Sequence, residues 1–317
     1  MTTPLRTAVI GTGYLGRFHA QKYAGRDDCS LVGICDHNAD HAHRVATELD
    51  CPHFLNHRDL LDKVDAVSIA TSTPSHHAVA KDFLSHGIHV LLEKPITTTV
   101  EEADELIALA KEHHCILQIG HLENFNNAIK ALRPKLNAPR FIRCQRLAPF
   151  QQRGTDVSVI LDLMIHDIEL VLSMVNASIT DIQATGSRVL SDHIDIANAR
   201  LLFKNGCMAD LSVSRVNDKP CRLMHVFQEG MSFDVDMHHK RLTTRFLTPG
   251  NAASIDRELE RFEKNDALKE QIANFCKNIT QHKNPSCDGQ AGRDALAIAI
   301  QISEALEAHN SKHALAS

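Results

Sequence analysis

The sequence has no C-x-x-C pair, no long apolar run and no excess of basic residues, and each absence excludes a class of protein. Its nine cysteines lack the spacing of a disulfide framework or a zinc ribbon, so we expect reduced thiols. No stretch approaches the roughly 20 apolar residues of a membrane span, and the first residues lack a signal-peptide pattern. We therefore expect a cytoplasmic protein without a membrane partner.

The formal net charge is −5, which argues against nucleic acid as a partner. The 21 histidines include the adjacent pairs His76-His77, His113-His114 and His238-His239, which invite a metal site. Neighbouring residues on one element point in different directions, and none of these pairs lies in an H-E-x-x-H motif, so we predict no metal. The chain of 317 residues is longer than one core usually serves, which favours two domains.

The stretch from Thr7 to His19 has the pattern of a strand that ends in a glycine loop and continues as a helix. Gly11 and Gly13 allow a tight turn and the close approach of a pyrophosphate, and Gly16 lets the helix pack against the strand. The free N–H groups at the start of the helix favour phosphates. The predicted cofactor-binding residues of this loop are Gly11, Thr12, Gly13, Tyr14, Leu15 and Gly16.

A second apolar run, Leu31 to Asp36, ends in an acidic residue at the separation that a dinucleotide-binding fold requires. A carboxylate there can bind both ribose hydroxyls of the adenosine and would repel a 2′-phosphate. The predicted cofactor is therefore NAD rather than NADP. In the alternative interpretation, Asp36 only caps the following helix.

From Arg6 to about Ile119, short apolar runs alternate with helical patterns, which is typical of an α/β Rossmann domain with a parallel sheet. Ligands lie beyond the carboxyl ends of such strands. The next strands of the pattern end in polar residues, and these residues should face the cofactor. In the alternative interpretation, the residues after the first of these strands only cap a helix, and the charged residues after the second only form a solvated ion pair. These residues are Thr71, Thr73, Pro74, His76, Glu93 and Lys94.

The β-α alternation stops after His121, so we predict a nucleotide-binding domain of residues 1–121 and a substrate-binding and oligomerisation domain of residues 122–317. The second half favours an α+β domain with an open, mainly antiparallel sheet, and Lys204 to Gly206 predicts a hairpin turn. Strands are expected at 140–147, 179–188, 198–203, 208–216, 223–227 and 241–246, and helices at 256–281 and 292–309.

A helix predicted from Val157 to Val175 carries the candidate acid–base pair. Its apolar residues fall on one stripe, and Asp162 and His166, four residues apart, project together from another face. A carboxylate one turn from an imidazole can hold its tautomer and tune its pKa for general-base work. The Asp167 side chain projects from a different side of this helix than Asp162 and His166. Alternatively, the polar side of this helix only faces water.

Five motifs occur in the order that resembles the Gfo/Idh/MocA oxidoreductase family: Gly11 to Gly16, Thr73 to His76, Glu93-Lys94-Pro95, Gly120-His121 and Asp162-x-x-x-His166. The resemblance covers nearly the whole chain. It implies an NAD-binding domain followed by a domain whose open sheet lines the substrate cleft and often forms homodimers or homotetramers. It also implies that Lys94 and His166 meet at the nicotinamide and that the Lys94–Pro95 bond is cis.

The run from Arg153 to Asp167 is similar to a branch of this family that oxidises the 3-hydroxyl of UDP-N-acetylglucosamine to a 3-keto sugar, on the route to lipid A. This resemblance implies that His166 removes the proton, Lys94 stabilises the alkoxide and Asp162 orients the site. Relatives near that branch carry an arginine and a proline shortly after the Gly-His motif, where this chain has neither. The substrate candidates are Glu123, Asn126 and, for the diphosphate, Arg153.

Other activities remain open on the same fold. The chain could be a dehydrogenase of free sugars or inositols, or a reductase of imines or tetrapyrroles. It could also be a non-catalytic NAD-binding regulator, because a fold alone does not confer chemistry.

Overall fold

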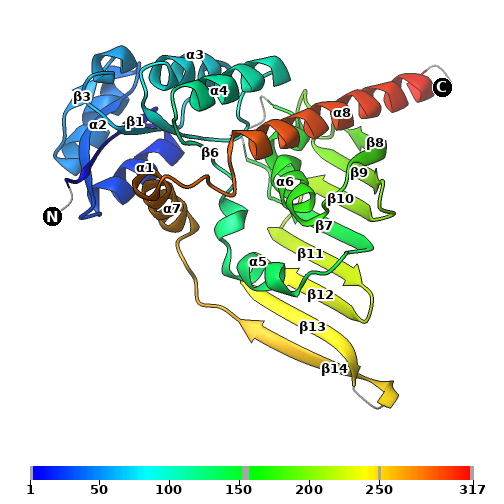
Figure 1. Cartoon of the computed structure of the whole chain (residues 1–317). Helices are drawn as coiled ribbons and strands as arrows, with labels where there is room; N and C mark the ends of the chain where they lie inside the picture. Colours follow the sequence, from blue (N-terminus) through cyan, green and yellow to red (C-terminus); the bar gives the residue numbers. More distant parts are fainter. Residues whose placement is uncertain (1–2, 152–156, 249–250, 315–317) are drawn as a thin grey trace. The chain divides into compact units, whose positions relative to one another are not determined.

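The computed structural model describes residues 3–151, 157–248 and 251–314 of the chain (Figure 1). The chain forms two compact units, one of Met1–Leu122 with Asp266–Leu296 and the other of Glu123–Asn265 with Ala297–Ser317. This division differs from the single boundary expected after residue 121, because the chain returns to the first unit near its end. Each unit is described separately below.

The first unit is built on a six-stranded sheet in the order β3-β2-β1-β4-β5-β6. Every neighbouring pair is parallel, so the predicted Rossmann sheet is confirmed. The order reverses between β1 and β4, and ligands of such sheets bind at the carboxyl ends of the strands at that point. The strands are β1 (Leu5–Ile10), β2 (Cys29–Cys35), β3 (His53–Phe54), β4 (Ala66–Ile69), β5 (His89–Leu92) and β6 (Leu117–Ile119).

The helices that accompany this sheet begin where the sequence supplies caps. The Asn38 side chain accepts from the His41 amide, and Thr99 and Glu102 form the expected capping box. The helical elements of the first unit are α1 (Tyr14–Ala24), α2 (Ala39–Leu49), η1 (His57–Leu60), α3 (Thr73–Leu84), α4 (Val100–Glu112) and α7 (Ala267–Gln281), with α8 (Gly289–Ala314) beginning in this unit.

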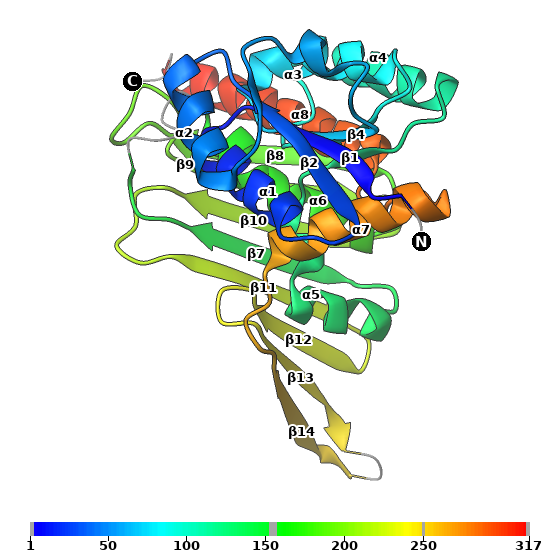
Figure 2. The ribbon, with the colours of Figure 1, turned by 90° about the vertical axis from the view of Figure 1, so that its left-hand side faces the viewer.

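Helix α7 explains why the chain returns to the first unit. It packs against α1, and the two helices lie side by side in Figure 2. The α7 residues Ile272, Phe275 and Cys276 are buried in the same core as Val9 and Tyr23. Burial of this apolar face stabilises the first unit, although α7 follows α1 by more than 200 residues in the sequence.

The helix expected over 256–281 begins later in the structure. Strand β14 continues to Arg261, paired with β13, and α7 starts only after Asp266, whose side chain accepts from the Lys269 amide. The strand β12 was also not predicted. Both differences arise because the hydrogen bonds of a strand come from its neighbour, which no local pattern specifies.

The second unit contains an eight-stranded sheet in the order β14-β13-β12-β11-β7-β10-β9-β8. Only β10 and β7 are parallel, so the mainly antiparallel sheet is confirmed. The predicted hairpin turn between β9 and β10 is also present, with Gly206 at φ +83°. The strands are β7 (Phe141–Leu147), β8 (Ile179–Ser187), β9 (Ile196–Phe203), β10 (Met208–Ser214), β11 (Cys221–Gln228), β12 (Met231–Asp236), β13 (Arg241–Thr248) and β14 (Asn251–Arg261).

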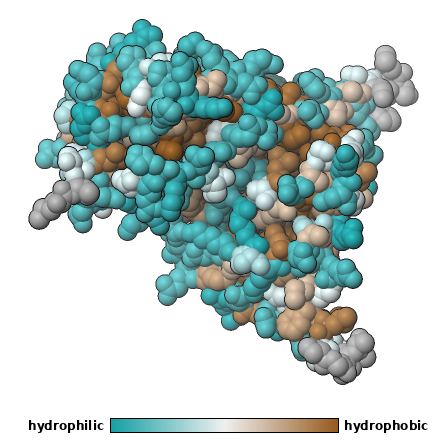
Figure 3. Space-filling model, viewed as in Figure 1, coloured by the Kyte–Doolittle hydropathy of each residue, from teal (hydrophilic) through white to brown (hydrophobic). Residues whose placement is uncertain are grey.

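One face of this sheet is covered and the other is open. Figure 1 shows α5 (Asn127–Leu132) and α6 (Ile165–Met174) on the covered face. Two 3₁₀ segments, η2 (Leu122–Phe125) and η3 (Arg133–Lys135), flank α5. The hairpin of β13 and β14 carries the exposed apolar side chains Leu247 and Ile255, and Figure 3 shows apolar atoms at its tip. No described helix is long and apolar enough to cross a membrane.

Candidate functional site

The glycine loop of the first unit is shaped by close backbone contacts. Gly11 has φ +86°, and a Cβ there would lie 2.6 Å from the Ala70 carbonyl oxygen. A Cβ on Gly16 would lie 1.7 Å from the Gly11 carbonyl oxygen. A Cβ on Gly13 would meet nothing within 4 Å. Two glycines are therefore required by the fold itself, whereas Gly13 borders open space from which a ligand can approach the backbone.

Helix α1 begins directly at this open side. Its N-terminal cap is Gly13, which has no side chain that could accept a hydrogen bond from the first turn. Tyr14, the first helical residue, is exposed. The N–H groups and the positive end of an 11-residue helix are thus directed at the loop, an arrangement that suits a diphosphate.

Asp36 lies at the carboxyl end of β2 and is tied to the same loop. Its carboxylate accepts hydrogen bonds from the Thr12 amide (2.7 Å), the Thr12 hydroxyl (2.9 Å) and the Asn38 amide (2.9 Å). Burial acts to raise the pKa of Asp36, but the N–H groups of Asn38 and Thr12 outweigh it and lower that pKa. The ionised carboxylate therefore stays in place beside the glycine loop.

A cavity of about 420 Å³ joins these features to the turn after β4. Its lining includes Gly13, Asp36, His41, Leu55 and Thr71. Among the described residues, no group forms a hydrogen bond with the buried Oγ1 of Thr71. An open glycine, an ionised acid and a buried hydroxyl that can still form a hydrogen bond fit the diphosphate and ribose groups of NAD.

The turn after β4 starts helix α3, with Ser72 as its cap and Pro74 in its first turn. Thr73 is the first residue of this helix. His76 is only 1% exposed, and its two ring nitrogens lie 2.9 Å from the Pro95 carbonyl oxygen and 3.1 Å from that of Thr71. Burial lowers the pKa of His76, and a neutral ring donates to only one of these oxygens. His76 therefore connects the Thr71 turn to the Pro95 segment.

Four ionisable groups lie at the carboxyl ends of β5 and β6: Glu93, Lys94, His121 and His19 of α1. Glu93 is 5% exposed, and its Oε1 lies 3.1 Å from Nε2 of the fully buried His19. Lys94 follows, and the Lys94–Pro95 bond is cis, as the family resemblance implies. A Cβ on Gly120 would lie 2.7 Å from the Glu93 carboxylate. The Gly-His motif therefore begins with glycine because Glu93 occupies the space beside it.

The electrostatic effects in this cluster favour a charged acid and a neutral imidazole. Burial acts to raise the pKa of Glu93, but the hydrogen bond from His19 and the charges of His19 and Lys94 lower it. Burial lowers the pKa of His121 to about 4, and the positive charge of Lys94 adds to that effect. At neutral pH, His121 is uncharged and Glu93 supplies negative charge beside Lys94.

In the second unit, the predicted acid–base helix contains an unexpected π-helical turn. The turn η4 spans Ile160–Met164 and includes Asp162, and α6 begins at Ile165, so His166 lies in its first turn. Such π-helical turns occur frequently at functional sites. The predicted apolar stripe is only part of the buried surface of this helix, because Asp167, Glu169 and Leu170 are buried as well.

A buried arginine holds the first turn of α6. Arg146 on β7 donates from Nε and Nη2 to the two carboxylate oxygens of Asp167, at 3.1 and 2.7 Å. It also donates from Nη1 to Glu123 at 3.0 Å. Glu123 accepts a further hydrogen bond from Arg222 at 3.3 Å. The side-chain oxygen of Asn126 caps α5 by accepting from the Ala128 amide, and its NH₂ group donates to Glu123 and to the Met237 carbonyl. The described contacts of Glu123 and Asn126 thus lie within this unit.

Asn124 and Glu169 form a second buried contact next to this cluster. The Asn124 amide donates to Glu169 at 2.6 Å, and Arg133 donates to the Asn124 carbonyl. Burial raises the pKa of Glu169 to about 7, while the Asn124 amide and Arg133 oppose the rise. Sequence reasoning missed both Glu169 and Arg146. The alternation on β7 carries a signal for Arg146, because it shares a face with the apolar Ile142 and Cys144.

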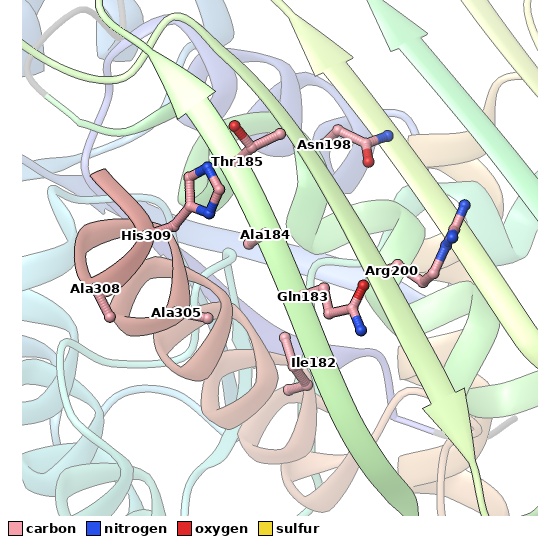
Figure 4. Close-up of a pocket in the computed structure, with 9 residues that line it drawn as sticks. All are labelled: Ile182, Gln183, Ala184, Thr185, Asn198, Arg200, Ala305, Ala308 and His309. Carbon is pink, nitrogen blue, oxygen red and sulfur yellow. The ribbon is translucent and has the colours of Figure 1, made fainter. Parts of the chain in front are cut away.

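A larger cavity, of about 590 Å³, lies between β8, β9 and the second half of α8. Figure 4 shows its polar side chains, among them Gln183, Asn198 and Arg200. None of the predicted site residues lines it. The smaller cavity beside the glycine loop is therefore the better candidate for cofactor binding.

Arg153, predicted to bind a diphosphate, lies outside the described residues. Lys94 belongs to the first unit and His166 to the second, so their meeting at a nicotinamide stays a prediction. All nine cysteines are free thiols. Within the part of the chain that the structure describes, no group of three or more potential metal ligands was found.

Comparison with known proteins agrees with this geometry. Residues 5–121 match the family model "Oxidoreductase family, NAD-binding Rossmann fold", and residues 134–233 match the "GFO/IDH/MocA C-terminal domain". The chain is 43% identical over 308 residues to the UDP-N-acetylglucosamine 3-dehydrogenase of Acidithiobacillus ferrooxidans, covering 96% of this chain and 98% of that protein. A solved structure of that enzyme superposes with a TM-score of 0.92 at 42% identity, covering 97% and 99% of the two chains.

A more distant relative is the myo-inositol 2-dehydrogenase of Thermotoga maritima, which is 25% identical over 96% of both chains. The family match spans both units of the chain and includes the glycine loop, the Glu-Lys-Pro strand end and the Gly-His motif. The chain therefore belongs to the Gfo/Idh/MocA oxidoreductase family and is an NAD-dependent dehydrogenase that acts on CH–OH groups.

Proposed function

We propose that this protein oxidises the 3-hydroxyl of UDP-N-acetylglucosamine to a 3-keto sugar. One observation carries the proposal: 43% identity to a UDP-N-acetylglucosamine 3-dehydrogenase extends over 96% of this chain and 98% of that enzyme. The similarity therefore includes the second unit, in which members of this family bind their substrates, as well as the nucleotide-binding fold.

The cofactor residues are proposed from the geometry of the first unit. The amides at Gly11 to Gly16 and the start of α1 would hold the diphosphate. Asp36 would accept hydrogen bonds from the adenosine ribose, and the turn from Thr71 through Thr73 and Pro74 to His76 would line the nicotinamide half. When bound, NAD⁺ supplies the acceptor for the hydride.

Three side chains are proposed to act on the substrate hydroxyl. His166 takes its proton as a general base, while the Lys94 ammonium stabilises the developing alkoxide. Asp162, four residues before His166, orients the imidazole. Glu93 and the neutral His121 support this arrangement, since Glu93 places a negative charge beside Lys94 and the His121 imidazole adds no positive charge.

We propose a different role for the substrate candidates Glu123 and Asn126. Both are bound to groups of their own unit, Glu123 to Arg146 and Asn126 to the Met237 carbonyl. We therefore propose that they shape the site through these contacts. Arg153 remains the proposed diphosphate contact, because a guanidinium can bind two phosphate oxygens at once.

The same similarity suggests a cellular setting. We propose that the 3-keto UDP-sugar is the substrate for a transamination that leads to lipid A with amide-linked chains, and that the protein acts in the cytoplasm. We also propose a homodimer or homotetramer formed through the open face of the eight-stranded sheet, on which Leu202 and Phe227 are exposed apolar residues. Size-exclusion chromatography with light scattering tests the assembly.

The test of the proposed activity is the absorbance of NADH formed from NAD⁺ with UDP-N-acetylglucosamine. We expect turnover with this sugar nucleotide and little with free sugars or myo-inositol. The His166→Asn variant should lose about 10²- to 10⁴-fold in kcat and still bind NAD⁺. The matched control is His86→Asn, at an exposed histidine on the first unit, which should keep the wild-type rate. Wild-type turnover by His166→Asn would exclude His166 as the base.

A second candidate function is a dehydrogenase of inositols, favoured by the 25% identity to the Thermotoga maritima enzyme over 96% of both chains. A higher kcat/KM for myo-inositol than for UDP-N-acetylglucosamine would establish this candidate and overturn the first.

A further inference from the structure

The charge cluster around Arg146 is placed where it can control the direction of the proposed base. Arg146 is 3% exposed and Asp167 is 1% exposed. Their contact uses two parallel N–H···O bonds, which fix the carboxylate in the plane of the guanidinium as well as at a distance. Asp167 directly follows His166 in the first turn of α6. The rotation of that turn about the helix axis is therefore set by Arg146.

The same guanidinium also fixes a second segment. Its Nη1 donates to Glu123, which is the first residue of the second unit and lies two positions after His121. Arg222 adds a second cation and Asn126 an amide to Glu123. The cluster thus contains two arginines and two carboxylates, so its charges balance, and strand β7 holds α6 and η2 through one side chain.

Energetics argue that this cluster has a geometric role. Buried ion pairs seldom stabilise a fold more than well-packed apolar side chains of the same volume, because desolvation cancels most of the attraction. Arg146 lies on a strand face that is otherwise apolar, beside Cys144 and Ile142. A leucine or methionine at this position would satisfy the packing. It could not determine the rotation of α6, because apolar contacts have no directional preference.

Resting on the proposed function, we propose that Arg146 is a positioning residue for His166. Through Asp167 it holds the first turn of α6 in the rotation at which the imidazole faces the substrate hydroxyl. The interaction with Glu123 keeps the guanidinium from turning with the helix. Arg146 does not touch the substrate in this proposal, so its loss should lower kcat and leave the KM for NAD⁺ unchanged.

The test compares Arg146→Lys with Arg200→Lys. Both arginines lie on strands of the same sheet and make two hydrogen bonds to an aspartate, but Arg200 is exposed on the open face and its partner Asp210 is half-buried. We expect Arg146→Lys to lower kcat by about 10- to 100-fold, with less than a twofold change in the KM for NAD⁺. Arg200→Lys should keep the wild-type kcat. A folded Arg146→Lys enzyme with wild-type kcat would overturn the proposal.

A double variant keeps the proposal testable if a lysine cannot be accommodated. Arg146→Met with Asp167→Leu removes both charges and leaves Glu123 paired with Arg222, so it should fold. Circular dichroism reports its folding. We expect low kcat in the folded protein, and wild-type kcat would overturn the positioning role.

Histidine NMR separates the failure of this proposal from the failure of the proposed function. The His166 ring signals are identified as those missing from His166→Asn, and they should shift in Arg146→Lys but not in Arg200→Lys, whatever substrate the enzyme uses. Unmoved His166 signals would overturn the positioning role alone. A wild type inactive with UDP-N-acetylglucosamine would overturn the proposed substrate and leave this measurement intact.

Discussion

Two buried glutamates, Glu93 in the first unit and Glu169 in the second, shift their pKa in opposite directions. They are 5% and 2% exposed, so burial disfavours the charged form of both. At Glu93, the hydrogen bond from His19 and the charge of Lys94 outweigh burial and lower the pKa. At Glu169, burial prevails over the Asn124 amide and raises the pKa to about 7. The partner, more than the degree of burial, decides the sign.

The two environments suit different tasks. A glutamate that stays ionised beside Lys94 places a negative charge at the cofactor end of the parallel sheet. A glutamate that titrates near neutral pH lies one helical turn from the proposed base and can carry a proton there. Three substitutions test this contrast by changing the carboxylates or the space around them.

The largest change in stability is expected from Gly120→Ala. The new Cβ would lie 2.7 Å from the Glu93 carboxylate, so the carboxylate must move away from His19. We expect the free energy of unfolding to fall by about 3 kcal/mol. Urea denaturation followed by circular dichroism measures it, since the chain has no tryptophan.

Gly13→Ala is the matched control for this substitution. A Cβ at Gly13 meets nothing within 4 Å, so the stability of the protein without cofactor should stay near that of wild type. Equal losses in the two variants would show that the Glu93 carboxylate does not constrain residue 120.

A smaller loss in the free energy of unfolding, about 2 kcal/mol at pH 7, is expected from Glu93→Gln. The variant keeps a hydrogen-bond acceptor for His19 but loses the charge. Because the folded pKa of Glu93 is lowered, its charge stabilises the fold above the unfolded pKa of about 4.3. That stabilisation is lost as the pH falls through the folded pKa. Denaturation at pH 7 and pH 4 should show the two proteins converging, and a constant difference would contradict the lowered pKa.

The smallest change in stability is expected from Glu169→Gln, and it is a gain rather than a loss. The folded pKa of about 7 lies above the unfolded value of about 4.3. The stability that Glu169 contributes is therefore complete below the unfolded pKa and is lost as the pH rises through the folded one. The glutamine side chain of the variant never ionises and can still accept from Asn124.

Relative to wild type, Glu169→Gln should thus become more stable by roughly 1 to 2 kcal/mol between pH 5 and pH 6.5. Denaturation midpoints at the two pH values measure the change. A variant that is less stable than wild type at pH 6.5 would mean that Glu169 is ionised and favourably paired in the folded protein.

Local sequence was sufficient to predict the glycine loop and the acid that follows the second strand. The glycines at 11 and 16 are required by contacts within a few residues of chain and with the neighbouring strand, and Asp36 follows its own strand. Such features depend on backbone conformation and short hydrogen bonds, which a motif records directly. The sheet type of both units and the Thr99 capping box were predicted for the same reason.

Interactions between distant residues were not predictable in this way. The sequence did not indicate that α7 packs in the core of the first unit, that β14 extends to Arg261, or that Arg146 binds Asp167 and Glu123. An amphipathic pattern shows that a face will be buried but not against what. The partner is chosen by the whole fold.

The amino-acid sequence by itself determined the parallel sheet, the glycine loop, the acid that follows the second strand and the family to which the chain belongs. Only the tertiary structure decided which buried acids are charged, why residue 120 must be glycine and what holds the helix of His166 in place. The physical reason is that backbone geometry is set by neighbours in the chain, whereas the electrostatic environment of a side chain is set by neighbours in space.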